Sequence, residues 1–239
     1  MGNNNEIRKA NALNYFRKDP LFHLDMSEPI KREKAMILFA DEEEGVLLKE
    51  VNSGAYLLSA LNEEVGKRMI DQIDHCELVC VHQEFLVSLL KSKFVFQEEL
   101  QLQQFGYLSK ELIEEKGDLI IRKLDKKDLE LVYENYQIYS FADLKQLRED
   151  DQLFGGYFDG QLAGFVGIHQ EGSLGLLKVL ESYQRRGFGR QLEAFITNYV
   201  LKKGWIPFGQ VAKGNLASES LQKSLGIAPA DGWIYWLFT

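Results

Sequence analysis

The sequence is poor in the features that define several common classes of protein. Its 239 residues include two cysteines, four prolines and four histidines, and two cysteines cannot form a disulfide framework. No stretch approaches the roughly 20 uninterrupted apolar residues that cross a bilayer. Residues 1–18 are polar and lack the apolar centre of a signal peptide. These absences predict a cytoplasmic protein with no membrane partner.

Charge argues against nucleic acid as a partner. The chain carries a net charge of −8, whereas a surface that neutralises phosphates must be basic. Residues 1–117 hold 14 basic and 21 acidic residues, and residues 118–239 hold 14 and 15. The second half also concentrates Arg185, Arg186 and Arg190 within six residues. This distribution predicts a local anion site.

The sequence predicts no metal site. Its two cysteines, Cys76 and Cys80, lie four residues apart in an apolar run. Two thiols do not make a structural zinc site, which takes four ligands.

The length and a change of pattern along the chain predict two domains. A domain commonly holds roughly 100 to 200 residues, and the polar, glutamate-rich interval Ser109–Gly117 is the best boundary candidate. We expect an α/β protein with mixed α+β sheets, divided into a smaller N-terminal domain over residues 1–117 and a C-terminal domain over residues 118–239. In the first domain, the pattern predicts a helical start, strands at 36–40, 45–48, 55–58, 78–81 and 98–107, and helices at 63–73 and 83–90.

Local signals are clearer in the second domain. Ser140 and Asp143 have the spacing of a capping box and predict a helix that ends at Glu149. Asp159-Gly160 between two apolar runs is a strong hairpin signal. The run Leu174–Leu180 is apolar except for Lys178 and predicts a central strand. Further strands are expected at 119–124, 153–158, 161–168, 208–211 and 233–238, with helices from 125, from 188 and over 215–225.

One segment combines a glycine-rich loop with the start of a helix. The predicted central strand leads into Gln184-Arg185-Arg186-Gly187-Phe188-Gly189-Arg190, after which apolar residues recur at helical spacing. The start of a helix presents unpaired N–H groups and the positive end of the helix dipole. Glycine at positions 187 and 189 lets an anion approach the backbone closely. The segment therefore predicts a phosphate site, against the simpler interpretation of a tight turn.

Two common phosphate loops do not fit. A Walker loop requires Lys-Ser/Thr after its last glycine, where this chain has Arg190-Gln191. A dinucleotide fingerprint requires a third glycine, where this chain has Leu192. Gln/Arg-x-x-Gly-x-Gly/Ala between a central strand and a helix instead resembles the acyl-CoA pyrophosphate loop of the GNAT superfamily.

A second segment adds to this resemblance. Asn215-Leu216-Ala217-Ser218 opens a helix that ends at Ser224-Leu225-Gly226-Ile227, similar to the asparagine and Leu-Gly segments of GNAT proteins. The resemblance covers residues 118–239 and is closest to the glycine N-acyltransferase-like branch. It implies a GNAT fold in the C-terminal half and acetyl-CoA or another acyl-CoA as co-substrate. The implied cofactor-binding residues are Lys178, Val179, Leu180, Arg185, Arg186, Gly187, Phe188, Gly189, Arg190 and Asn215, although Asn215 could equally cap its own helix.

The usual catalytic pair of the superfamily is incomplete. Many members place a glutamate base where this chain has Ser173, two residues after Glu171, and a tyrosine acid where it has Gln222. Proton removal from the amine still requires a base, so the base candidates are Glu171, His169 and Glu181. The acid candidates are Tyr183 and Tyr235, and we place Glu171, Ser173 and Tyr183 in the catalytic set. A solvated turn glutamate and core packing of the aromatic run 233–238 are the competing interpretations.

The sequence thus predicts an acyl-CoA-dependent N-acetyltransferase that acts on a small-molecule amine by direct attack. A non-catalytic acyl-CoA-binding or sensing module is the alternative. The N-terminal half is either an unrelated domain or a degenerate copy of the same fold, which would not bind coenzyme A because it lacks a Gly-x-Gly loop. The acceptor is not identified, and both a monomer and a homodimer remain open.

Overall fold

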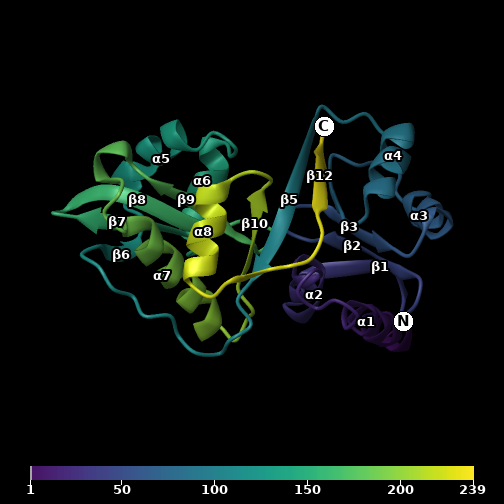
Figure 1. Ribbon diagram of the computed structural model, residues 1–239. Helices are drawn as coiled ribbons and strands as arrows, with labels where there is room; N and C mark the ends of the chain where they lie inside the picture. The colour runs from purple at the N-terminus through teal and green to yellow at the C-terminus, as the bar shows by residue number, and fades with distance from the viewer. Residues whose placement is uncertain (1) are drawn as a thin grey trace. The chain divides into compact units, whose positions relative to one another are not determined.

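A computed structural model describes residues 2–239 (Figure 1). The density of internal contacts divides the chain into two compact units. Unit 1 comprises residues 1–106, 210–215 and 229–239, and unit 2 comprises residues 107–209 and 216–228. This division differs from a single break near residue 117, because the chain returns to unit 1 after most of unit 2 is complete.

Unit 1 is a mixed sheet with helices on both faces. Its strands lie in the order β1-β2-β3-β4-β12-β5, and β3 and β4 are parallel because α3 connects them. The predicted strands and helices of this region are all found within a few residues of their expected positions. Its elements are α1 (Gly2–Phe16), α2 (Leu24–Lys31), β1 (Ala35–Asp41), β2 (Gly45–Glu50), β3 (Tyr56–Ala60), α3 (Glu63–Ile70), β4 (Leu78–Val81), α4 (Glu84–Lys93), β5 (Glu98–Gly106) and β12 (Ile234–Phe238).

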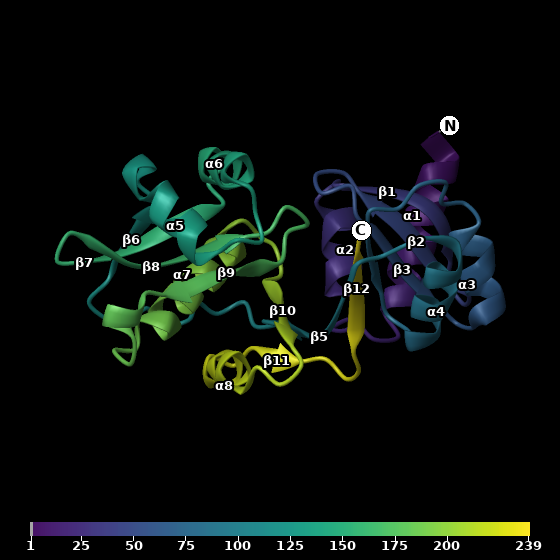
Figure 2. The same ribbon diagram turned by 90° about the horizontal axis from the view of Figure 1, so that it is seen from above.

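Strand β12 comes from the far end of the chain and lies in the interior of this sheet (Figures 1 and 2). It pairs antiparallel with β4 on one side and with β5 on the other. Successive side chains of a strand point to opposite faces, so Tyr235 and Leu237 pack in the core under α3 and α4, whereas Ile234 and Trp236 pack under α1 and α2. The aromatic run therefore serves core packing in unit 1.

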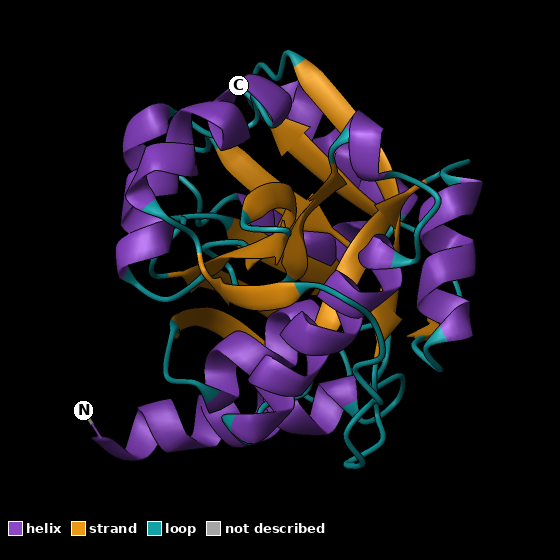
Figure 3. Ribbon diagram, turned by 90° about the vertical axis from the view of Figure 1, so that its left-hand side faces the viewer, coloured by secondary structure: helices purple, strands orange, loops and turns teal. Residues whose placement is uncertain are grey.

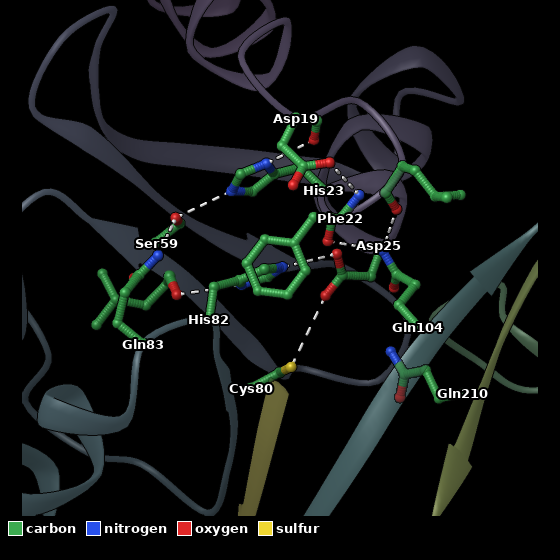
Figure 4. A network of polar contacts seen from close by, with 12 residues as sticks. Asp19, Phe22, His23, Asp25, Ser59, Cys80, His82, Gln83, Gln104 and Gln210 are labelled. Atoms are coloured by element: carbon green, nitrogen blue, oxygen red, sulfur yellow. Dashed lines mark hydrogen bonds and ion pairs between the residues drawn. The ribbon is translucent and has the colours of Figure 1, made fainter. Parts of the chain in front are cut away.

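A network of polar side chains is buried in unit 1 near the ends of β3 and β4 (Figure 4). The Ser59 hydroxyl lies 3.0 Å from His23 Nε2, and the His23 and His82 rings stack with centroids 4.9 Å apart. His82 Nε2 in turn lies 3.0 Å from Asp25 Oδ1. His23 Nδ1 lies 2.9 Å from the carbonyl oxygen of Asp19, which fixes the proton of the neutral ring on Nδ1.

This network predicts that unit 1 loses stability in acid. Burial, followed by repulsion from His82, lowers the pKa of His23 from 6.5 to about 3, against weaker raising effects from Asp19 and Asp25. Between these two values the unfolded chain binds a proton that the folded chain excludes. Stability should therefore fall by up to about 1.4 kcal/mol per pH unit as the pH drops from about 6.5 towards 3.

Urea unfolding at pH 7 and pH 5 measures this effect. A His23→Gln variant should show a smaller loss between the two values than the native protein. His75 lies on the surface with 79% of its side chain exposed, so His75→Gln is the matched control and should retain the native slope. Equal slopes for His23→Gln and the native protein would contradict the prediction.

Unit 2 is also a mixed sheet covered on both faces (Figures 1 and 3). Its strand order is β10-β9-β8-β7-β6, with β9 and β10 parallel across α7. Helices α5 and α6 pack on one face and α7 on the other. Its elements are β6 (Ile120–Lys123), η1 (Lys126–Asp128), α5 (Leu129–Asn135), α6 (Phe141–Glu149), β7 (Leu153–Phe158), β8 (Gln161–Ile168), β9 (Leu174–Val179), η2 (Glu181–Tyr183), α7 (Phe188–Lys202), β10 (Phe208–Ala212), α8 (Leu216–Ser224) and β11 (Ala228–Pro229). The division between the units falls within β10 and β11, so residues 210–212 and Pro229 count with unit 1.

The capping box and the hairpin turn predicted in unit 2 are both present in the structure. Ser140 and Asp143 form a capping box at the start of α6. Asp159 and Gly160 both have positive φ, +50° and +78°, and turn β7 into β8, as a two-residue hairpin loop requires. The mixed α/β fold class is thereby confirmed.

The glutamate-rich interval before residue 118 is not a loose connection. Asn198 on α7 accepts a hydrogen bond from the Ile113 N–H and donates to the Ile113 carbonyl, both at 2.8 Å. Two helical turns earlier, Gln191 forms the same pair of bonds with Leu119, both at 3.0 Å. The polar composition indicated a boundary, but buried amide side chains attach this segment to α7.

Candidate functional site

The glycine-rich loop leaves the start of α7 open to a ligand. Gly187 is the N-cap residue with φ of +79°, and no side chain caps the helix. The first N–H groups of this 15-residue helix therefore have no side-chain acceptor at the cap. In unit 1, by contrast, the Asn62 side chain caps α3 by accepting from the Val65 N–H at 3.1 Å. The helix start behind the predicted anion site is therefore open, whereas the start of α3 is occupied by a side chain of the chain itself.

A hollow of about 440 Å³ lies in front of this helix start. It contains six of the ten residues implied to bind the cofactor, whereas Leu180, Arg186, Arg190 and Asn215 are not among its lining residues. Sequence reasoning missed the contribution of α8, although Ala217 and Ser218 lie in the recognised Asn215–Ser218 segment. The lining residues are Leu177, Lys178, Val179, Gln184, Arg185, Gly187, Phe188, Gly189, Ala217, Ser218 and Leu221.

The two glycines keep this space open. A Cβ on Gly187 would have no heavy atom within 4 Å. A Cβ on Gly189 would lie 3.7 Å from Val179 Cγ2 and 3.9 Å from Leu221 Cδ2, which are ordinary contact distances. Neither glycine is required to prevent a collision within the protein, although the φ of +79° at Gly187 favours glycine there; both leave the hollow and the backbone accessible.

The three clustered arginines have three different environments. Arg190 donates to the carbonyl oxygen and to the hydroxyl of Ser224, at 2.8 and 3.1 Å, and so holds the end of α8. Arg186 lies over the rings of Phe158 and Tyr183, 5.5 and 5.8 Å from their centroids. Arg185 lines the hollow and has no hydrogen-bond or ion-pair partner within residues 2–239. Only Arg185 is therefore free to meet an anion in the hollow.

This difference predicts unequal effects of charge reversal. Arg185→Glu should weaken the binding of coenzyme A about 100-fold or more at low salt, because a charge-assisted contact becomes a repulsion. Arg186→Glu is the matched control, with the same charge change one residue away, and should weaken binding less than tenfold. Titration of coenzyme A at two salt concentrations measures both, and equal losses would contradict this assignment.

Strand β9 has an irregular backbone beside the hollow. Leu176 has φ of +50°, an uncommon conformation for a branched side chain. The register with β8 shifts at the same place, so that Leu176 and Leu177 lie opposite Val166, as in a β-bulge. The pairing of β9 with β10 is limited to Leu174 and Gly209. The later residues of β9 therefore have backbone groups that no β10 ladder occupies.

The turn between β8 and β9 brings two of the predicted catalytic residues together. The Ser173 hydroxyl donates to Glu171 Oε1 at 2.5 Å, and the His169 N–H donates to the Ser173 carbonyl at 2.8 Å. Tyr139, from the connection between α5 and α6, lies against His169 with 2.7 Å between Oη and Nδ1. Sequence reasoning missed Tyr139, because a loop tyrosine 30 residues away carries no local signal.

The remaining candidates lie elsewhere. Tyr183 is at the other end of β9, in η2, and donates to Gln161 Oε1 at 3.0 Å. Tyr235 belongs to unit 1, where its hydroxyl accepts from Gln101 at 3.3 Å. Gln222, in the position of the superfamily's tyrosine acid, donates to Glu193 Oε1 at 2.9 Å. Burial raises the pKa of Glu193, so the α7–α8 contact contains a weakly acidic carboxyl.

Two further kinds of feature are absent from the described part of the chain. Within residues 2–239, no three His, Cys, Asp or Glu side chains gather as metal ligands. None of the helices in this range combines the length and the apolar character needed to cross a bilayer.

Comparison with known proteins points to one fold. A family model described as FR47-like protein matches residues 156–236, and no curated protein matches the sequence. A Drosophila protein structure covers 96% of this chain and 88% of its own, with 15% identity and a TM-score of 0.65. A GCN5-related N-acetyltransferase from Kribbella flavida covers 91% and 95%, with 12% identity and a TM-score of 0.58. A tandem GNAT protein from the clavulanic acid biosynthesis pathway covers 98% and 95%, with 11% identity and a TM-score of 0.51.

Similarity at this level of identity establishes the GNAT fold. Together with the FR47-like match over residues 156–236, it supports the GNAT superfamily. It gives no support to the glycine N-acyltransferase-like branch.

Proposed function

We propose that unit 2 binds acyl-CoA in the hollow before α7 and transfers an acetyl or other short acyl group to a small-molecule amine. The observation that carries this proposal is the uncapped start of α7 facing a hollow of about 440 Å³. Arg185 and Lys178 line that hollow and have no polar partner within residues 2–239. Backbone N–H groups and nearby cations are what a pyrophosphate requires.

The cofactor would lie along the loop and strand. The backbone from Arg185 to Arg190 would bind the pyrophosphate. The backbone at Lys178, Val179 and Leu180, on the edge of β9 that no β10 ladder occupies, would pair with the amides of the pantetheine arm as an added strand does, and the bond from Gln184 to the Val179 carbonyl would be exchanged for it. Asn215 would help to place the start of α8, whose Ala217 and Ser218 line the hollow.

Glu171 is the proposed base for the chemical step. The amine nitrogen would bond to the thioester carbon, the carbon–sulfur bond would break, and Glu171 would accept the proton of the amine. Ser173 would orient Glu171, whose Oε2 has no partner within residues 2–239. Tyr183, the predicted acid, lies at the opposite end of β9 from Glu171 and donates to Gln161, so the departing thiolate would take its proton from water.

One observation favours a non-catalytic acyl-CoA sensor as the second candidate. Gln222 stands in place of the superfamily's tyrosine acid and is engaged with Glu193. A sensor would bind acyl-CoA without turnover, so acylation of any amine at an enzymatic rate would exclude it.

Unit 1 is proposed to be a degenerate GNAT-like half without cofactor. Its β3-α3-β4 crossover has the same parallel arrangement as β9-α7-β10. The connection before α3 is only Leu61-Asn62, and Asn62 caps the helix itself. We therefore expect one acyl-CoA site per chain.

Isothermal titration of acetyl-CoA and coenzyme A into the full-length protein tests the proposal. We expect binding with a stoichiometry of one, followed by release of coenzyme A when amines are added. Cationic amines should be preferred because residues 1–117 are acidic overall. An absence of heat with both ligands would exclude the cofactor site, whereas binding without turnover would favour the sensor.

A further inference from the structure

The contact between Tyr139 and His169 is specific in both distance and orientation. Tyr139 Oη lies 2.7 Å from His169 Nδ1. The two rings also stack, with centroids 5.7 Å apart and an angle of 29° between their planes. Both side chains are only partly exposed, so the pair is held in one arrangement.

The hydrogen-bond partners of this pair favour one position for each proton. The backbone N–H of Gln170 donates to the Tyr139 hydroxyl, and burial, with the charge of Glu171, raises the pKa of Tyr139 far above its usual value. Tyr139 therefore keeps its proton and has one O–H to donate, for which His169 Nδ1 is the neighbouring acceptor. A neutral imidazole carries one N–H. With Nδ1 as the acceptor of the Tyr139 hydroxyl, the proton of His169 lies on Nε2.

The Nε2 atom faces the start of β9. A side chain on Gly175 would collide with the His169 ring, so glycine at this position makes room for it. His169 Nε2 has no partner within residues 2–239 and is not among the buried polar atoms of that range that lack one, so solvent reaches it. Glu171, two residues away, likewise has one carboxylate oxygen without a partner in the described chain.

We propose that Tyr139 is a positioning residue that holds His169 as an Nε2–H donor, and that the acceptor amine carries an oxygen atom that receives this bond. Glu171 then remains as the proton acceptor, and His169 is excluded as the base in the neutral form of the site. The acceptor class is an amine with a carbonyl or hydroxyl group close to the nitrogen. This inference rests on the proposed acyl transfer for its substrate, but the tautomer of His169 is independent of it.

Long-range ¹H–¹⁵N correlation spectra of the histidine rings test the tautomer in the full-length protein. The chain has four histidines, and the spectrum of His169→Gln assigns the signal. We expect the Nε2–H pattern in the native protein and a loss of that preference in Tyr139→Phe, which removes only the hydroxyl. Tyr136→Phe is the matched control, because that phenol contacts the backbone of Leu176 and not His169. An Nδ1–H pattern in the native protein, or no change in Tyr139→Phe, would overturn the proposal.

A pair of amines tests whether the Nε2–H group of His169 binds an oxygen atom of the acceptor. Phenylalaninamide and phenethylamine share the aromatic body and the amine but differ in the carboxamide. With acetyl-CoA, the native protein should prefer phenylalaninamide about tenfold or more in kcat/KM, as one hydrogen bond allows. Tyr139→Phe and His169→Phe should remove this preference while acetyl-CoA affinity stays within about twofold of native.

The outcomes of this assay separate the two proposals. Equal use of both amines by the native protein would overturn the donor role of His169. Loss of acetyl-CoA binding in the native protein would count against the proposed function instead. If neither amine is acetylated, the histidine spectra alone decide whether Tyr139 positions His169.

Discussion

Gly189→Trp should fold normally and lose measurable affinity for coenzyme A, with a Kd raised at least about 1,000-fold. The Cβ of residue 189 would make only ordinary contacts with Val179 and Leu221, so the substitution does not disturb the backbone of α7. The indole would instead occupy the hollow that these residues line. It would also cover the first N–H groups of the helix, which no side chain caps. Isothermal titration measures the affinity, and circular dichroism checks the fold.

Two further variants make this test selective. Lys202→Trp places the same side chain on an exposed position at the opposite end of α7 and should leave binding unchanged. Gly189→Ala adds one methyl group and should stabilise the helix by up to about 1 kcal/mol while it weakens coenzyme A binding by about tenfold. A stabilised variant with native affinity would show that the cofactor does not approach this part of the backbone.

Removal of residues 233–239 should abolish the cooperative unfolding of unit 1 while unit 2 remains folded. β12 pairs on both sides, with β4 and with β5, and its side chains enter both cores of unit 1. Loss of one buried leucine alone costs about 2–5 kcal/mol, and domains are stable by only about 5–15 kcal/mol. Unit 2 contains none of these residues.

Tryptophan fluorescence reports the result directly. The chain has three tryptophans, and the truncation removes Trp233 and Trp236, so that Trp205 in unit 2 is the single remaining reporter. Its unfolding transition should persist, whereas hydrogen exchange should show unprotected amides in β1 to β5. Leu237→Ala is a milder version and should destabilise unit 1 by about 2–5 kcal/mol, whereas Thr239→Ala on the exposed end should have little effect. Protected amides in the truncated protein would disprove this role of β12.

The elements were predictable because their signals are local. The capping box at Ser140, the Asp159-Gly160 turn and the helical spacing after Phe188 depend only on residues close in sequence, and the structure contains all three. The glycine loop was predictable for the same reason. Its position before α7 follows from a strand, a turn and a helix in succession.

The long-range contacts were not predictable from such signals. An apolar run such as 234–238 indicates a buried strand, but nothing in it indicates which strands it joins, and it joins β4 and β5. The arginines looked equivalent in sequence, yet Arg185 alone of the three lines the hollow. Arg186 lies over two aromatic rings, and Arg190 donates to Ser224 at the end of α8. Tyr139 meets His169 only because the α5–α6 connection crosses the turn before β9.

The position of β12 has a consequence for synthesis on the ribosome. A first domain usually folds as soon as it has emerged, but the gap between β4 and β5 is filled only after residue 238 has been added. At about 5–20 residues per second, roughly 6–25 s separate the completion of β5 from the arrival of β12. Throughout this interval β4 and β5 have unpaired edges that another nascent chain could join. The growing chain is therefore most exposed to aggregation while residues 107–234 are being added, and chaperone binding would protect it most at this stage.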